Sequence, residues 1–202
     1  MVKEAIEIGR LLRSGITGFV VGCRVSELEA PSFGSLVLAP LGDYQIYGLI
    51  HDIHVDDDGL VRQLVTSDSV NTEVIEDNRL NRNVPMEMSV MTVGYRAQDK
   101  VWHLLPPRAP LSLDSIRQCT PDEIFEFTGS GRFGYFRHIL RNSDLPISEL
   151  LAAHLQQVQP VHVAKGKATW GNDAAKELIT LLRDDYPTLM SVLSALGDAL
   201  PG

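Results

Sequence analysis

The fold is decided by residues 79–110, which read RLNRNVPMEMSVMTVGYRAQDKVWHLLPPRAP. Apolar side chains recur at every second position in the middle of this stretch, at Val84, Met86, Met88 and Val90. This period is typical of a strand with one buried face, and the prolines at 106, 107 and 110 cannot extend a strand ladder. The chain before the stretch is β-rich and the chain after it is helical. We therefore predict a barrel-closing strand over 84–96, followed by a stiff proline-rich segment at 104–110 that leads into the helical part and is here called the proline exit.

Four strand-like segments precede this stretch, at about 4–13, 19–25, 34–39 and 45–55. Pro40 is predicted to end the third of them, and residues 100–105 to add a final edge strand. Between about 60 and 82 the apolar spacing becomes helical, which indicates a short helical insertion. We therefore predict an α+β protein, in which a small closed β-barrel of about six strands occupies residues 1–110.

An α-helical domain, distinct from the barrel, is predicted over residues 111–202. Thr120, Pro121 and Glu123 form a capping box with proline at the first helical position, which predicts a helix to about 128 and an end at Gly129. Four more helices are expected at 132–142, 146–159, 172–185 and 187–196, with a loop or short strand at 161–170. The third and fourth of the five helices carry apolar stripes, at Leu150, Leu151, Leu155 and Val158 and at Leu178, Ile179, Leu181 and Leu182.

The composition is that of an ordinary folded protein, with 202 residues, 44% hydrophobic and 22% charged. No apolar run is long enough to cross a membrane, and the N-terminus lacks the layout of a signal peptide, so a cytoplasmic location is expected. Cys23 and Cys119 lack metal-type spacing and are interpreted as apolar filler. The net charge of -8 makes direct binding of nucleic acid unfavourable.

Two segments carry residue types that could support chemistry. The first, residues 51–59, contains two histidines and four aspartates, but a straight strand places His51 and His54 on opposite faces and spreads the others too widely for one metal ion. The second, residues 129–136, has the glycine spacing of a phosphate-binding loop, but Tyr135 and Phe136 stand where Lys and Ser or Thr are needed. We therefore expect no catalytic residue, no metal and no cofactor.

Four arginines within residues 79–110 form the one candidate docking patch: Arg79, Arg82, Arg96 and Arg108. Arginine is favoured where the carboxylates of a protein partner are recognised. The alternative is intrachain pairing with nearby acids, such as Glu73, Glu76 or Asp77. Arg137 and Arg141 also lie one helical turn apart.

Several segments resemble a known family. Residues 8–9, 34–42, 47–50 and 84–96 resemble the HAS barrel, the small N-terminal barrel of HerA-type DNA translocases that rotary ATP synthase subunits share. The runs NRLNRNVP at 78–85, VGYR at 93–96 and LPPRAPL at 105–111 resemble a stand-alone branch of such barrels that lacks the ATPase domain. The later runs DEI at 122–124, YFR at 135–137 and ELLAAHL at 149–155 are also similar to that branch.

The resemblance implies an accessory role, because the phosphate loop and acidic strand of the translocase have no counterpart here. It implies a non-catalytic docking protein near HerA-type ATPase and NurA-type nuclease machinery for DNA-end processing, with homo-oligomer formation through the barrel as a further option. A nucleic-acid-binding barrel is the alternative, since five-stranded barrels bind single strands, although the acidic charge and sparse aromatic residues weigh against it. An enzyme without a recognisable motif is the third hypothesis.

Overall fold

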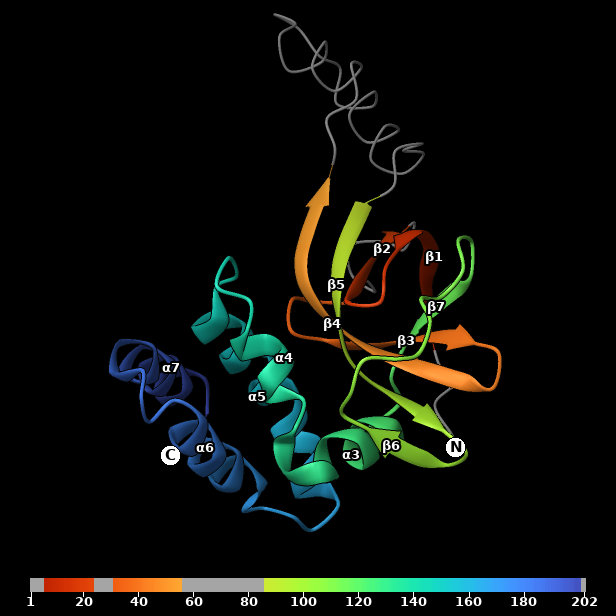
Figure 1. Ribbon diagram of the computed structural model, residues 1–202. Coiled ribbons are helices and arrows are strands. Elements are labelled where there is room, and N and C mark those ends of the chain that lie inside the picture. Colours follow the sequence, from red (N-terminus) through yellow and green to blue (C-terminus); the bar gives the residue numbers. More distant parts are fainter. Residues whose placement is uncertain (1–5, 24–30, 56–85, 201–202) are drawn as a thin grey trace, which may run out of the picture.

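The computed structural model describes residues 6–23, 31–55 and 86–200 (Figure 1). The strands are β1 (Glu7–Ser14), β2 (Gly18–Cys23), β3 (Leu36–Leu41), β4 (Tyr44–Val55), β5 (Met86–Ala97), β6 (Lys100–Trp102) and β7 (Ser115–Gln118). The helical elements are α3 (Pro121–Gly129), the 3-10 turn η1 (Gly131–Phe133), α4 (Phe136–Leu140), α5 (Ile147–Ala164), α6 (Trp170–Leu181) and α7 (Tyr186–Ala199).

Six of the strands in the described part of the chain close into an antiparallel barrel. Their order is β2-β1-β7-β3-β4-β5, and the pairing of β5 with β2 closes the circle. The short β6 forms a hairpin with the C-terminal end of β5, where Tyr95 pairs with Trp102. The predicted α+β class, the closed barrel and the helical C-terminal region are confirmed.

The middle of the long strand β4, residues 46–50, is buried on both faces, and this is where the sequence of the strand is continuously apolar. Ile46 and Ile50 point into the barrel, whereas Tyr47 and Leu49 belong to a second core that lies under the helices. Between the two isoleucines, Gly48 leaves room for the barrel interior, because a Cβ there would lie 2.3 Å from Val90 and 2.8 Å from Phe19.

The second core joins the barrel to the helices. It combines barrel residues such as Leu38 and Tyr47 with helical residues such as Phe127, Leu150 and Leu155. Tyr47 stacks on Phe127 with ring centroids 4.2 Å apart. The outer face of the barrel is therefore part of the helical core, while the helical unit distinct from the barrel stays a prediction.

Strand β7 lies within residues 111–202, for which an all-helical region is predicted, so that prediction is wrong at this point. It lies between β1 and β3, pairing Gly9 with Ile116 and Leu38 with Arg117. Its four residues, Ser-Ile-Arg-Gln, include a single large apolar side chain, so no period-two signal could reveal it. The barrel thus ends at Gln118.

Pro40 does not end β3, contrary to the prediction. The strand continues to Leu41, with Pro40 paired to Gln45 of β4. On its other side, β3 pairs with β7 only at Val37 and Leu38, so the missing N–H of Pro40 lies where no ladder bond is needed.

The predicted helix at 132–142 is divided into η1 and α4. Arg132 and Phe133 have φ angles of 49° and 55°, in the left-handed region, so no continuous helix can pass through them. The capping box of α3 is confirmed, with the Thr120 hydroxyl accepting from the backbone N–H of Glu123 and the Glu123 carboxylate accepting from that of Thr120.

Helix α5 is longer than predicted and passes through Pro160 to Ala164, where a loop or strand was expected. Pro160 cannot donate to Gln156, but both residues are exposed, so water can satisfy the free carbonyl. The predicted stripe of α5, Leu150, Leu151, Leu155 and Val158, is buried as expected.

In α6 the buried stripe differs from the predicted one. Leu178 and Leu182 are buried with Trp170 and Ala174, whereas Ile179 and Leu181 are exposed. The helices gather on one side of the barrel, with α6 and α7 outermost (Figure 1). None of the helices within the described ranges has the length and apolar character needed to cross a membrane. The predicted helical insertion at 60–82 lies outside the described residues.

Candidate functional site: an arginine groove between barrel and helix

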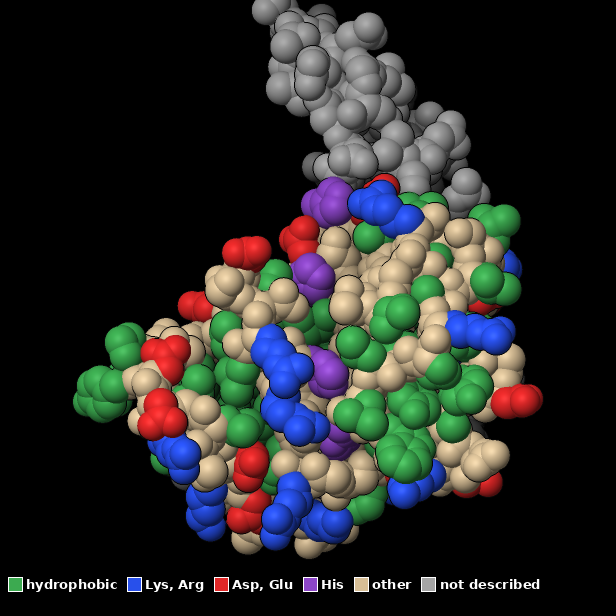
Figure 2. Space-filling view, in the orientation of Figure 1, with side chains coloured by type: hydrophobic (Ala, Val, Ile, Leu, Met, Phe, Trp, Pro, Cys, Tyr) green, Lys and Arg blue, Asp and Glu red, His purple; other side chains and the backbone are tan. Residues whose placement is uncertain are grey.

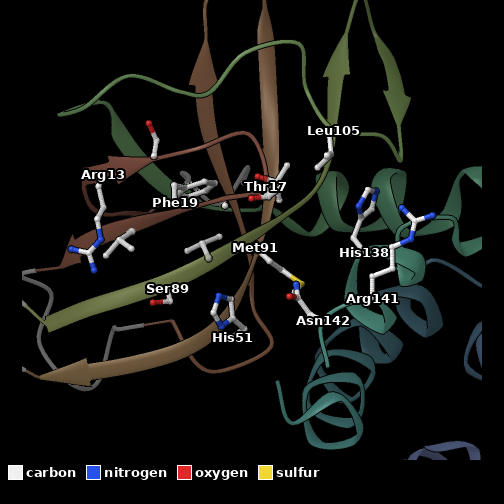
Figure 3. Close-up of a pocket in the computed structure, with 15 residues that line it drawn as sticks. Arg13, Thr17, Phe19, His51, Ser89, Met91, Leu105, His138, Arg141 and Asn142 are labelled. Carbon is white, nitrogen blue, oxygen red and sulfur yellow. The ribbon is translucent and has the colours of Figure 1, made fainter. Parts of the chain in front are cut away.

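A groove of about 670 Å³ lies where the barrel meets α4. It is here called the arginine groove (Figure 3). Its lining comes from β1, β2, β4 and β5, from the proline exit and from α4: Arg13, Ser14, Thr17, Gly18, Phe19, Val20, His51, Ser89, Val90, Met91, Thr92, Leu105, His138, Arg141 and Asn142. In Figure 2, histidine and Lys or Arg side chains gather in a band between the helices and the barrel.

The charges of the arginine groove are of one sign. Arg13 and Arg141 lie at opposite sides of it, with Met91 and His51 between them (Figure 3). None of the described residues that line the groove is Asp or Glu. The groove therefore has a positive lining, although the whole chain carries a net charge of -8.

The two arginines differ in how they are engaged. Arg13 donates to the carboxylate of Glu87 over 3.2 Å, but its guanidinium has five N–H donors and its side chain is 66% exposed, so donors remain for a ligand. Arg141 forms no ion pair with any residue in the described part of the chain. It follows α4 directly and is exposed.

Two irregularities in strand pairing accompany Arg13 and His51. Between β1 and β2 the register jumps from Leu11–Val21 to Arg13–Val20, so Leu12 is the extra residue of a bulge. Between β4 and β5 it jumps from Ile50–Val90 to Asp52–Ser89, so His51 is the extra residue. A bulge bends a strand and redirects side chains, and these two lie where β1 and β4 border the groove.

Burial keeps the two histidines of the groove uncharged at neutral pH. Desolvation lowers the pKa of His51, and the neighbouring carboxylate of Asp52 opposes this only in part. Desolvation also lowers the pKa of His138, with a further contribution from the charges of Arg137 and Arg141, while the bond to His103 opposes it. His138 uses its Nε2–H to donate to the backbone oxygen of His103 over 3.2 Å. Both rings thus offer hydrogen bonds but no charge.

Unused polar atoms also line the arginine groove. The hydroxyl of Thr92, a residue only 2% exposed, and Nδ1 of His51 are both buried without a hydrogen-bond partner among the described residues. Such atoms are uncommon in folded proteins, because each costs about 1–3 kcal/mol when left unpaired. Both atoms lie beneath the surface of the groove, so a ligand reaches them only if the Thr92 or His51 side chain turns outward.

The arrangement is suited to holding an anion. Guanidinium groups form paired hydrogen bonds to carboxylate or phosphate oxygens. Nucleophilic catalysis would need a nucleophile hydrogen-bonded to a base, and within the described residues no hydrogen bond joins Ser89 to His51. Likewise, no group of three or more metal-binding side chains is assembled among residues 6–23, 31–55 and 86–200.

His154 and His162 belong to the core between barrel and helices. His154 is fully buried and bonds both Tyr135 and the backbone oxygen of Gly34. His162 is also buried, and its Nε2 lies 2.8 Å from the Thr128 hydroxyl. Burial lowers the pKa of each to about 4, and for His162 the charge of Lys167 lowers it further. These rings are therefore neutral parts of the packing.

The predicted docking arginines lie elsewhere. Arg96 forms ion pairs with Glu126 at 3.3 Å and with Asp99 at 3.6 Å, so intrachain pairing engages it. Arg108 is exposed, and the structure gives it no ion pair with another described residue. Each lines another hollow beside the turn between β3 and β4, away from the arginine groove: Arg108 one of about 460 Å³ and Arg96 one of about 810 Å³. Arg79 and Arg82 lie outside the described residues.

Of the two segments considered for chemistry, the first contributes His51 to the arginine groove, and the second has a structural role. His54 lies 3.4 Å from Asp52 and 3.7 Å from Glu87, at the end of β4, while residues 56–59 lie outside the described part. In the glycine-rich segment, Gly129 ends α3, and Tyr135 and Phe136 are fully buried in the core. Residues 129–136 therefore connect α3 to α4 through η1.

Sequence reasoning missed the arginine groove as a site. The spacing of Arg137 and Arg141 was a usable signal, since it places both on one face of a helical turn. Nothing in the sequence indicates that Arg13 and His51 approach this turn, because bulges and the packing of α4 on β5 bring them there. A scan of protein-family models and a search of curated proteins found no match for this chain.

Proposed function

We propose that this protein is a non-catalytic docking protein whose barrel and helices together hold a protein partner. The observation that carries the proposal is the arginine groove: a hollow of about 670 Å³ with two arginines, no lining carboxylate and unpaired polar atoms. Arginine is enriched at protein interfaces, where its planar group recognises carboxylates. The resemblance to HAS barrels suggests a HerA-type ATPase or a NurA-type nuclease as the partner.

Two further observations support a role without catalysis. Tyr135 and Phe136, which stand where a phosphate-binding loop needs Lys and Ser or Thr, are 0% exposed and part of the core. The histidines with lowered pKa values are placed by packing, with partners such as the Gly34 and Phe127 backbone oxygens. We expect neither binding nor hydrolysis of Mg-ATP by this chain alone, and micromolar binding in a calorimetric titration would contradict the proposal.

The docking role is tested by capture with the purified full chain. We expect it to retain a HerA-type ATPase or a NurA-type nuclease from native lysate, identified by mass spectrometry, and to bind the same protein after separate purification. Capture should be lost in the double variant Arg13→Glu/Arg141→Glu. The matched control is Lys176→Glu/Arg183→Glu, which changes the net charge equally on exposed positions of another surface. Equal capture by both variants would exclude the arginine groove as the docking surface.

A second candidate, a nucleic-acid-binding barrel, has one observation in its favour. Tyr95 and Trp102 are stacked with centroids 6.5 Å apart, Tyr44 lies beside Tyr95, and Lys100 lies over Trp102 at 4.0 Å. Proteins that bind single-stranded nucleic acid stack its bases on aromatic side chains and place cations beside them. However, Asp43 and Asp99 line the same hollow and oppose phosphate. A salt-dependent gel shift abolished by Trp102→Ala would favour this candidate.

A further inference from the structure

We infer that the arginine groove takes an extended acidic peptide, in which carboxylates alternate with apolar side chains. This rests on the docking role proposed above and specifies the chemistry of the segment that the groove accepts. It does not depend on which protein carries that segment.

Charge complementarity selects an anionic occupant. The chain carries 26 acidic and 18 basic residues, yet none of the 15 residues around the groove is acidic. Arg13 and Arg141 occupy its two sides, so one extended segment could place a carboxylate against each guanidinium (Figure 3). Arg137, one helical turn before Arg141, is exposed but does not line the groove, and its Nε donates to the Gly134 backbone oxygen. Each contact would be a charge-assisted hydrogen bond.

The floor of the groove suits a peptide backbone with some apolar side chains. Val20, Met91 and Leu105 line it, and Leu105 is 41% exposed. The Thr92 and His51 side chains also line the groove, and a rotation of either side chain would let its buried polar atom bond to the backbone of a bound segment. The volume of about 670 Å³ lies within the roughly 300–1,000 Å³ of ordinary ligand pockets, enough for a short segment.

Nucleic acid fits the arginine groove less well. Binding of single strands relies on aromatic rings whose faces are open to the bases. The one Phe, Tyr or Trp among the residues that line this groove is Phe19, and it is only 3% exposed because its ring belongs to the barrel interior. The net charge of -8 also repels a long polyanion, whereas a short acidic segment meets chiefly the local positive lining.

The test measures binding of a fluorescein-labelled peptide, Glu-Leu-Glu-Leu-Glu-Leu-Glu, to the full chain by fluorescence anisotropy. We expect saturable binding that weakens as salt rises, at least tenfold weaker binding of the same peptide with glutamine for glutamate, and no binding of the lysine version. The double variant Arg13→Glu/Arg141→Glu should bind the acidic peptide at least tenfold more weakly. The control Lys176→Glu/Arg183→Glu should stay within about twofold of the unaltered chain. Thermal melting of each variant establishes that it is folded. Arg141→Gln is a milder change at an exposed position, and it should weaken binding of the acidic peptide by several fold.

Three results would overturn the inference. One is absence of saturable binding of the acidic peptide, another is equal loss in the groove variant and its control, and the third is tighter binding of a twelve-residue oligothymidylate than of the peptide. The inference and the docking role fail separately. If the peptide binds but no HerA-type or NurA-type protein is captured, the inference stands and that partner is excluded. If capture depends on the groove but the peptide does not bind, the docking role stands and the inference is wrong.

Discussion

The hydroxyl of Tyr135 donates a hydrogen bond to Nε2 of His154 over 3.1 Å, and both residues are fully buried between the barrel and the helices. The other ring nitrogen of His154 lies 3.0 Å from the backbone oxygen of Gly34. Because a carbonyl can only accept, Nδ1 carries the proton and Nε2 of the neutral ring accepts from Tyr135. This chain of bonds links the turn before α4, helix α5 and the segment that leads into β3.

Removal of the Tyr135 hydroxyl should weaken this link. We expect Tyr135→Phe to lower the free energy of unfolding by about 1–2 kcal/mol, because the buried Nε2 of His154 loses its donor. Burial raises the pKa of Tyr135 well above its usual value, so the hydroxyl remains a donor at every practical pH. The measurement is urea denaturation at pH 7. Tyr186→Phe, at a residue that is 67% exposed, is the control, and an equally small effect of both changes would show that the bond contributes nothing.

Acid should destabilise the protein through His154 and His162. Burial lowers the pKa of each to about 4, whereas an unfolded histidine has a pKa of 6.5. The unfolded chain therefore binds protons below pH 6.5 that the folded chain does not bind until about pH 4. The contribution of both rings is complete above pH 6.5 and is lost as the pH falls towards 4.

The groups that face these rings set the size of the effect. His154 faces the Tyr135 hydroxyl and the Gly34 oxygen, and His162 faces Thr128, Trp170, Phe125 and the cation of Lys167. For His154 alone the loss reaches about 3 kcal/mol below pH 4, since one pKa unit corresponds to about 1.4 kcal/mol. Urea denaturation at pH 7.0, 6.0 and 5.0 tests this in a range above the usual pKa of carboxyl groups. Equal stability at all three values would contradict the buried neutral state of these histidines.

Gly34 is required where the barrel meets α5. Its φ angle is +83°, and a Cβ would lie 2.8 Å from the backbone nitrogen of His154 and 2.9 Å from the carbonyl carbon of Ala153. We expect Gly34→Ala to cost about 3 kcal/mol, from left-handed strain and from displacement of α5. Gly166→Ala is the control, because its φ angle is +79° with nothing within 4 Å, and it should cost only about 1 kcal/mol. Equal costs, measured by thermal melting, would show that contact with α5 is unimportant.

The chain shortened to residues 1–110 should not form a stable barrel. It lacks β7, so the paired edges of β1 and β3 would be left open, and the outer faces of Tyr47 and Leu49 would lose the helical core. We expect a circular dichroism spectrum without a cooperative thermal transition, while the full chain melts in a single transition. A folded 1–110 fragment would show instead that β7 only covers a barrel that is stable without it.

Much of the fold could be predicted, because several segments carry local signals that their packing does not override. The alternation around Met88 and Val90 predicts β5, the capping box at Thr120 predicts the start of α3, and the stripe at Leu150 and Leu155 predicts the buried face of α5. In each, the period of the apolar residues agrees with the element that buries them.

The remaining features depend on tertiary context. Strand β7 is held by two neighbours and needs only Ile116 in the core, so four residues suffice without any pattern. The arginine groove depends on the bulges at Leu12 and His51 and on the distance of α4 from β5, and spacing along the chain reports none of these. The predicted docking patch groups arginines that are close in sequence. In the structure, Arg96 forms an ion pair with Glu126 and does not line the arginine groove with Arg13.

The position of β7 also has a consequence for the order of events during folding. Glu7 in β1 pairs with Arg117, so this part of the ladder joins positions about 110 residues apart in the chain. Such non-local pairing slows folding, because a long loop must close before any contact compensates for its lost entropy. During synthesis, β1 leaves the ribosome long before its partner exists and can pair only with β2. The circle is therefore completed by the last strand to emerge, almost at the moment when α3 becomes available to cover it.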